Sequence, residues 1–219
     1  MPSAGMKPLQ WRLEANGFDC RLFSYPSYRC TVPENAERLA RFTANQPETE
    51  FDAVTFSMGG IVLRWAVNHQ KMPRLRRVVM IGPPNQGATM ADLSDRWLGP
   101  GFPILFGRSA RQLRTGDGGL CERAGILPAE TELGIIAGGT GRATGFNPLI
   151  GRDNDRVVAV DETVLEGMKS FTILPIAHGP LLFSRETARL CTGFLQSGGF
   201  GKQEITPPLH SGPPMRLSA

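Results

Sequence analysis

Apolar residues recur at helical spacing in three stretches of the chain. The first covers residues 4–16, and the second begins at the capping box Thr31-Val32-Pro33-Glu34 and runs to about Phe42. The third runs from about Ser184 to Gln196. A further helix is predicted over Met58–Asn68, where the residues are apolar nearly all round, as is typical of a buried helix.

Short apolar runs alternate with these helices and predict strands. The runs are Cys20–Tyr25, Phe51–Phe56, Arg77–Gly82, Leu133–Ala137 and Phe171–Ala177. The sequence Val78-Val79-Met80-Ile81 is of the kind that is covered on both faces in a parallel sheet. The alternation predicts an α/β fold with a mostly parallel sheet and helices on both faces.

The length of 219 residues is enough for one domain with a substantial core, and we expect that domain over residues 1–196. The pattern weakens over 91–132, where two interpretations stay open: a cap or lid over an acyl pocket, or loops and short helices packed on the core. Residues 197–219 are rich in Gly, Pro and Ser without periodicity, and we expect a disordered tail there.

Composition and charge exclude several classes of function. With 41% hydrophobic and 20% charged residues and a net charge of +4, the chain is typical of a globular protein, and it has no basic and aromatic interleaving that indicates nucleic acid. No apolar run is long enough for a membrane span, and the start lacks an apolar signal core, so a cytoplasmic protein is expected. The sequence leaves the oligomeric state open.

No cofactor or metal is expected. The Gly138-Gly139-Thr140-Gly141 run lacks the lysine of a phosphate-binding loop, and the histidines have no ligand spacing. The four cysteines, which fit neither a zinc site nor a redox pair, are expected to be free thiols. A Cys20–Cys30 bridge is the alternative if the protein is exported.

The segment Val54-Thr55-Phe56-Ser57-Met58-Gly59-Gly60 carries the strongest chemical signal. A predicted strand runs into Ser57, and two glycines follow where a helix begins. A tight strand-to-helix turn of this kind exposes a serine hydroxyl and aims the next backbone N–H, that of Met58, at a developing oxyanion. The pattern G-x-S-x-G is incomplete, since Thr55 stands at its first position, and an ordinary strand–helix junction is the alternative.

A nucleophilic serine needs a base, and the chain has three histidines. His69 falls at the end of the helix that follows Ser57 and is too far along it to reach back, and His210 falls in the predicted tail. His178 directly follows the strand predicted over Phe171–Ala177, at the edge where parallel sheets hold their sites. His178 is therefore the candidate base, with a packing role for a strand-end histidine as the alternative.

An acid that orients this imidazole is expected between Ser57 and His178 in the chain. Asp153 and Asp155 are both candidates in a polar turn that precedes the apolar run Val157–Val160. The acidic pair Asp161-Glu162 lies just beyond that run. A solvated turn is the alternative for each of these carboxylates.

With these positions in place, the chain resembles lipase and esterase members of the α/β-hydrolase superfamily. Four segments carry the resemblance: Phe56-Ser57-Met58-Gly59-Gly60, Val78–Gly87, Asn154-Asp155-Arg156-Val157-Val158 and Ile173–His178. They are similar to the superfamily's H-S-M-G-G elbow, its strand ending in G-x-P-H/N-x-G, its N-D-G-x-V acid turn and its histidine-bearing strand.

By position, the resemblance implies Ser57 as nucleophile, Asp155 as acid, His178 as base and Met58 as one oxyanion donor. Thr55 and Arg156 both stand where the superfamily usually has Gly, so the acid turn is expected to bend differently. The superfamily also opens with an apolar strand ending in His-Gly, whose following loop supplies the second donor. This chain is expected to lack that strand, which would lie between the strands matching residues 20–25 and 51–56.

The resemblance implies a serine hydrolase that cleaves carboxylic esters of a small molecule or lipid through an acyl-enzyme. Acyl transfer to another alcohol would use the same residues. A non-catalytic relative that keeps only a binding role is the remaining alternative.

Overall fold

The computed structural model describes residues 3–90 and 119–208. Its sheet consists of β1 (Glu50–Phe56), β2 (Arg74–Ile81), β3 (Glu132–Gly138) and β4 (Met168–Leu174). These four strands lie in the order β1-β2-β3-β4, and every neighbouring pair is parallel. The predicted α/β fold with a parallel sheet is therefore confirmed.

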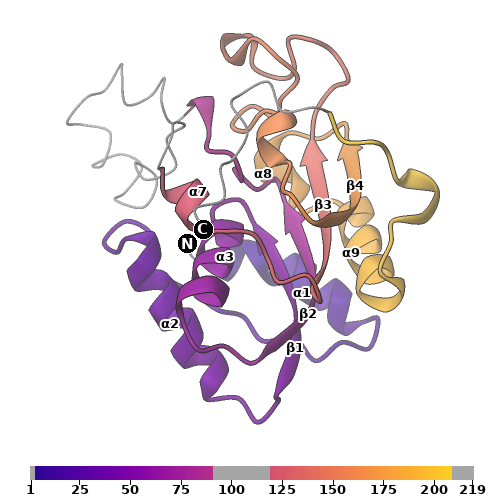
Figure 1. Cartoon of the computed structure of the whole chain (residues 1–219). Coiled ribbons are helices and arrows are strands. Elements are labelled where there is room, and N and C mark those ends of the chain that lie inside the picture. The colour runs from indigo at the N-terminus through magenta and orange to yellow at the C-terminus, as the bar shows by residue number, and fades with distance from the viewer. Residues whose placement is uncertain (1–2, 91–118, 209–219) are drawn as a thin grey trace.

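Helices precede, separate and follow the strands (Figure 1). The α-helices are α1 (Lys7–Glu14), α2 (Val32–Ala44), α3 (Gly59–His69), α7 (Leu120–Arg123), α8 (His178–Leu181) and α9 (Arg185–Ser197). The short 3₁₀ helices are η1 (Ser3–Met6), η3 (Pro148–Ile150), η4 (Asp161–Thr163) and η5 (Gly201–Gln203).

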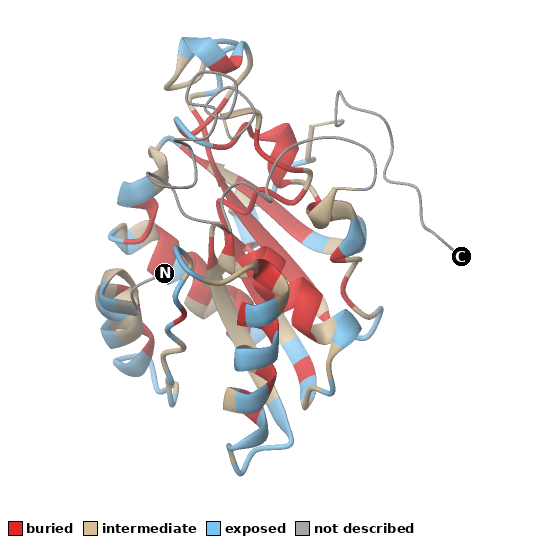
Figure 2. Ribbon diagram, turned by 90° about the vertical axis from the view of Figure 1, so that its left-hand side faces the viewer, coloured by how far each residue is buried: buried red, intermediate tan, exposed pale blue. Residues whose placement is uncertain are grey.

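The two faces of the sheet are covered by different helices. Helices α1 and α9 pack on the face that carries Phe56, Val79 and Ile81, whereas α2 and α3 cover the opposite face. Because side chains alternate along a strand, each strand contributes apolar residues to both cores. Figure 2 shows that the buried residues are concentrated in the sheet and in the helix surfaces that face it.

Local sequence signals account for the ends of the two longest helices. At the start of α2, the Thr31 side chain accepts from the backbone N–H of Glu34, whose carboxylate accepts in return from the N–H of Thr31 at 2.6 Å. The predicted capping box is thus confirmed. Ser184 caps α9 through its hydroxyl, which accepts from the N–H groups of Glu186 and Thr187, and Gly198 ends this helix at φ 77°.

The strand predicted over Cys20–Tyr25 is a wrong prediction. Residues 18–26 join no strand ladder, because no neighbouring strand lies within hydrogen-bonding reach of them in the described part of the chain. Their side chains still alternate, with Phe18 and Cys20 packed toward the core under α1 and α9 and Phe23 and Tyr25 toward the core under α2 and α3.

The disordered tail predicted from residue 197 needs correction as far as residue 208. Phe200 is 5% exposed, and its ring centroid lies 5.3 Å from that of Phe194 in α9. The N–H of Ile205 donates to the carbonyl of Phe171 in β4 at 2.9 Å. Burial of this phenylalanine anchors the stretch. Residues 209–219 and most of the predicted cap, 91–118, lie outside the described residues.

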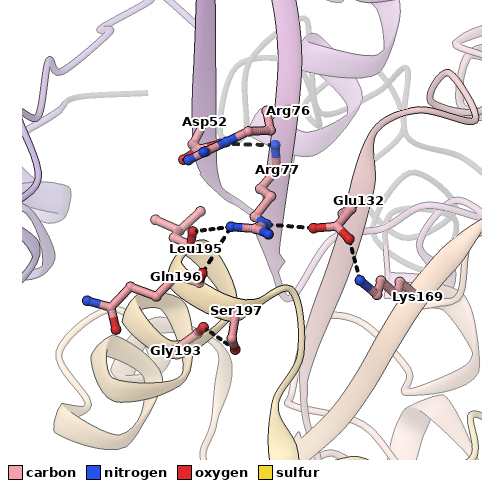
Figure 3. Close-up of polar contacts among 9 residues, drawn as sticks. All are labelled: Asp52, Arg76, Arg77, Glu132, Lys169, Gly193, Leu195, Gln196 and Ser197. Atoms are coloured by element: carbon pink, nitrogen blue, oxygen red, sulfur yellow. Dashed lines mark hydrogen bonds and ion pairs between the residues drawn. The ribbon is translucent and has the colours of Figure 1, made fainter.

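An ionic network ties the middle of β2 and the amino-terminal ends of β3 and β4 to the carboxyl end of α9 (Figure 3). The Arg77 guanidinium donates to the carbonyls of Leu195 and Gln196 and pairs with Glu132, which also pairs with Lys169. Bonding to Lys169 and then to Arg77 lowers the pKa of Glu132. The candidate site lies at the opposite, carboxyl-terminal edge of the sheet.

Candidate active site

Ser57 occupies a strained turn between β1 and α3. Its φ is 52°, in the left-handed region that few residues other than glycine adopt. Its N–H donates to the carbonyl of Ile81 at 2.8 Å, which holds the turn against β2. Such strain costs of order 1–3 kcal/mol and persists where the surroundings impose it, often at functional positions.

The glycines after Ser57 explain why Thr55 is tolerated. A Cβ added to Gly59 would lie 3.6 Å from the Thr55 Cβ, and one added to Gly60 would lie 3.5 Å from the Thr55 Oγ1 and 3.2 Å from the Met80 Sδ. The helix therefore supplies the space that a glycine at position 55 would otherwise give.

Asp155 and His178 form a buried hydrogen-bonded pair. The His178 Nδ1 lies 2.5 Å from the Asp155 Oδ2, and the side chains of His178 and Asp155 are 12% and 0% exposed. The other carboxylate oxygen, Oδ1, accepts from the N–H groups of Val157 and Val158 at 2.9 and 2.8 Å. These hydrogen bonds engage both oxygens of Asp155 and thus fix the orientation of its carboxylate.

The acid turn keeps a glycine-like shape even though it contains Arg156. Arg156 has φ 100°, in the positive-φ region that glycine adopts more readily than other residues. The fully buried Asn154 holds the turn, because its side chain donates to the carbonyls of Thr144, Asn147 and Arg152 and accepts from the N–H groups of Asn147 and Arg156. This network outweighs the strain at position 156.

The remaining candidate carboxylates face other partners. Asp153 accepts from the N–H groups of Thr140 and Gly141, and Asp161 pairs with Arg152. Each therefore stabilises loop structure away from the imidazole.

Glu162 joins two loops at the carboxyl edge of the sheet. It is fully buried and accepts from Thr89, Arg152 and the N–H of Ala159, and burial raises its pKa. It thereby links the loop after β2 to the loop that carries Asp155. Its network positions the acid turn.

His178 begins α8 beside the carboxyl ends of β3 and β4 (Figure 1). Residues at or just after the carboxyl ends of β1, β2 and β3 surround the His178–Asp155 pair. The ring centroid of Phe56, the last residue of β1, lies 4.8 Å from that of the imidazole. A Cβ on Gly82 after β2 would lie 3.2 Å from the His178 Nδ1, and one on Gly138 at the end of β3 would lie 2.7 Å from the Asp155 Cβ. The small residues at these ends make room for the pair.

Ser57 directly follows Phe56 and so lies at the same edge as this pair. Within residues 3–90 and 119–208, no hydrogen bond joins Ser57 to His178. Catalytic hydrogen bonds are often long in the absence of substrate and shorten when it binds. The backbone N–H of Met58 also donates no hydrogen bond to another described residue, as an oxyanion donor requires.

The other groups that the sequence singled out lie apart from this edge. His69 is near the end of α3, where its ring stacks on Trp65 at 4.3 Å between centroids, and His210 lies outside the described residues. No disulfide bond joins Cys20, Cys30, Cys121 or Cys191 within the part of the chain that the structure describes. Among the described residues, no cluster has the makeup of a metal site, and none of the helices is long and apolar enough to cross a bilayer.

Sequence reasoning did not assign positioning roles to Asn154, Gly82 and Glu162. Asn154 carried a usable signal, since asparagine side chains commonly hydrogen-bond to nearby backbone in turns. The contacts of Gly82 and Glu162 depend on segments distant in sequence, which no local pattern indicates.

Comparisons with known proteins bear on the fold. A family model described as "Domain of unknown function (DUF7379)" matches residues 18–98, and a comparison with curated proteins finds no match. The mature form of the Bacillus licheniformis lipase BlEst2 is similar over 87% of this chain and 83% of its own, with a TM-score of 0.62 and 20% identity. The Legionella pneumophila phospholipase PlaB is similar over 89% of this chain, with a TM-score of 0.61 and 15% identity, and the chain spans 53% of PlaB.

At these identities the likeness establishes the fold alone. The chain has the parallel sheet and helical layers of the α/β-hydrolase fold, as the resemblance implied. The family model does not reach Asp155 or His178. The chemistry of the site therefore rests on its own geometry.

Proposed function

We propose that this chain is a serine hydrolase that cleaves carboxylic ester bonds. The observation that carries the proposal is the buried Asp155–His178 pair at 2.5 Å, set at the same sheet edge as a serine held at φ 52°. A neutral imidazole whose Nδ1–H is bonded to a carboxylate leaves its Nε2 free to accept a proton, as a general base must.

In the proposed mechanism, the Ser57 Oγ attacks the acyl carbon while His178 Nε2 takes its proton. The tetrahedral oxyanion is stabilised by the N–H of Met58, and Asp155 stabilises the imidazolium. His178 then protonates the leaving alcohol, which gives an acyl-enzyme on Ser57. Water attacks this ester with His178 again as base, and the acid is released.

The second oxyanion donor is not assigned to any described residue. The resemblance places this donor in a loop that follows an apolar strand. Loss of one such donor typically costs about 2.7–4 kcal/mol in the barrier. The proposed substrates are small-molecule or lipid esters.

The test is hydrolysis of p-nitrophenyl esters of increasing acyl length by the wild type and by Ser57→Ala. The proposal expects turnover that Ser57→Ala abolishes while its circular dichroism and unfolding midpoint are retained. Turnover that survives in the variant would contradict a role for Ser57. Transfer of the acyl group to an added alcohol, in preference to hydrolysis by water, would favour the acyltransferase alternative.

A folded wild type that hydrolyses none of the esters would favour a non-catalytic relative.

A further inference from the structure

Arg64 carries a buried positive charge on the helix that follows Ser57. It lies about two turns along α3 from that serine, and its side chain is fully buried. Burial lowers its pKa to about 10, so the guanidinium is still protonated at neutral pH. Its hydrogen bonds in the described part of the chain all go to neutral oxygens. Because a buried charge without a counterion is costly, these oxygens have to satisfy it closely.

The oxygens that bond to Arg64 come from two segments far apart in the sequence. Its Nε and Nη2 donate to the carbonyls of Gly125 and Cys121 at 2.6 and 2.7 Å. Its Nη1 donates to the carbonyl and to the Oδ1 of Asn85 at 3.1 and 3.2 Å. Arg64 therefore fixes α3 to α7 on one side and to the loop after β2 on the other.

Asn85 extends this contact to the segment that follows the acid turn. Its side chain is fully buried, and its Nδ2 donates to the carbonyl of Thr163 in η4 at 2.8 Å. The N–H of the next residue, Gln86, donates to the carbonyl of Glu162 at 3.0 Å. The loop after β2 is thus bonded to η4 by consecutive residues.

The same short helix η4 holds the acid turn. The carboxylate of Glu162 accepts from the N–H of Ala159 at 2.8 Å. Ala159 in turn forms an antiparallel bridge with Asn154, the neighbour of Asp155. A continuous path of hydrogen bonds therefore runs from α3 through Asn85 and η4 to the turn that carries the proposed acid.

We propose that Asn85 is a positioning residue, held by Arg64, which sets the turn of Asp155 relative to the helix of Ser57. Its two side-chain atoms have separate tasks, since Oδ1 accepts from Arg64 and Nδ2 donates to η4. Displacement of a catalytic group by about 1 Å can lower a rate about a hundredfold. The effect on catalysis rests on the proposed hydrolysis, whereas the coupling between the two segments does not.

The test variant is Asn85→Asp, which has nearly the same size. It keeps an acceptor for Arg64, and the neighbouring guanidinium keeps the new carboxylate ionised. It therefore loses only the donor to Thr163. We expect kcat for p-nitrophenyl ester hydrolysis to fall at least about tenfold, as for one lost buried hydrogen bond between the two segments.

Amide hydrogen exchange gives a second readout that needs no activity. The N–H groups of Val157 and Val158 bond to the Asp155 carboxylate, so their exchange reports opening of the acid turn. We expect both to exchange at least about tenfold faster in Asn85→Asp, measured relative to the amide of the fully buried Ile135 in β3. The ratio removes any change in global stability. Asn85→Ala, which loses both side-chain bonds, should give the same result and replaces Asn85→Asp if that variant does not fold.

Asn68 provides a matched control on the same helix. Its Nδ2 donates to the carbonyls of Arg64, Ala124 and Ile126 at 3.0, 2.9 and 2.8 Å. Asn68→Ala therefore loses contacts between α3 and the residues after α7, but none of them leads to η4. It should lower the unfolding midpoint and leave both kcat and the exchange ratio near their wild-type values.

Four outcomes decide between the possibilities. Wild-type kcat and exchange ratio in a folded Asn85→Asp would overturn the proposal, because the side chain would then serve packing alone. Equal losses in Asn68→Ala would also overturn it, since any loosening of α3 would have the same effect. A wild type that hydrolyses no ester, but whose valine amides respond to Asn85→Asp, would refute the proposed hydrolysis and support the coupling. An active wild type whose valine amides do not respond would refute the coupling and leave the hydrolysis in place.

Discussion

Replacement of Asp155 by asparagine separates orientation of the imidazole from simple packing. Asparagine has nearly the same size, but it offers one oxygen where the aspartate uses two. If that oxygen stays on the N–H groups of Val157 and Val158, the NH₂ group faces the His178 Nδ1. That nitrogen must then accept, the ring proton moves to Nε2, and Nε2 no longer takes the Ser57 proton.

The alternative amide orientation is also unfavourable. The NH₂ group would then face two backbone N–H groups, and two hydrogen bonds of about 1 kcal/mol each would be lost. We therefore expect the first orientation, an intact fold and a fall in kcat of ~10⁴-fold, or about 5 kcal/mol in the activation free energy.

The assay is p-nitrophenyl ester hydrolysis, with the rate of serine labelling by a fluorophosphonate as a second readout. Asp153→Asn is the matched control, because the Asp153 carboxylate accepts from Thr140 and from the N–H of Gly141 and not from His178. It should lower the unfolding midpoint but keep kcat near the wild-type value. The reasoning is refuted if Asp155→Asn keeps more than about a tenth of wild-type kcat, or if both variants lose activity equally.

Four further changes test other parts of the account. Gly82→Ala puts a Cβ 3.2 Å from the His178 Nδ1 at φ 54°, so we expect at least about a tenfold loss in kcat and ~1–3 kcal/mol of stability; wild-type kinetics would contradict this contact. Arg156→Gly relieves a positive φ and should stabilise by about 1 kcal/mol in urea unfolding, whereas a lowered midpoint would argue against strain. Thr31→Ala removes the capping acceptor and should cost about 1 kcal/mol in the same assay; an unchanged midpoint would count against the box. The pKa of Glu132 is lowered on folding, so its contribution is present above its ordinary pKa and is lost as pH falls through the folded value. Urea midpoints of the wild type and Glu132→Gln should therefore converge in acid, and a constant gap would contradict the linkage.

The sequence indicated most elements of the fold because their signals are local. The capping box at Thr31 and the continuous apolar run before Gly82 both depend on neighbouring residues, and both elements form. The strand predicted over Cys20–Tyr25 does not form, because strand formation depends on residues distant in sequence. An apolar alternating segment becomes a strand only when a distant partner supplies hydrogen bonds, and no strand in the described part of the chain pairs with this segment.

The candidate site was predictable in part. The position of Ser57 followed from a strand-to-helix pattern, and His178 from elimination among three histidines. The residues alone left Asp153 and Asp155 both open, because both belong to one polar turn, and only the resemblance favoured Asp155. It depends on how Asn154 folds that turn, and the fold directs the Asp155 carboxylate at the imidazole.

The most direct measurement of the central claim is labelling of the folded wild-type chain by a fluorophosphonate probe, with the modified residue located by mass spectrometry. Such probes react with an activated serine. The account predicts a single adduct on Ser57, its absence in Ser57→Ala and much slower labelling in His178→Ala. A folded wild type that remains unlabelled, or an adduct on another serine, would contradict the claim that Asp155 and His178 activate Ser57.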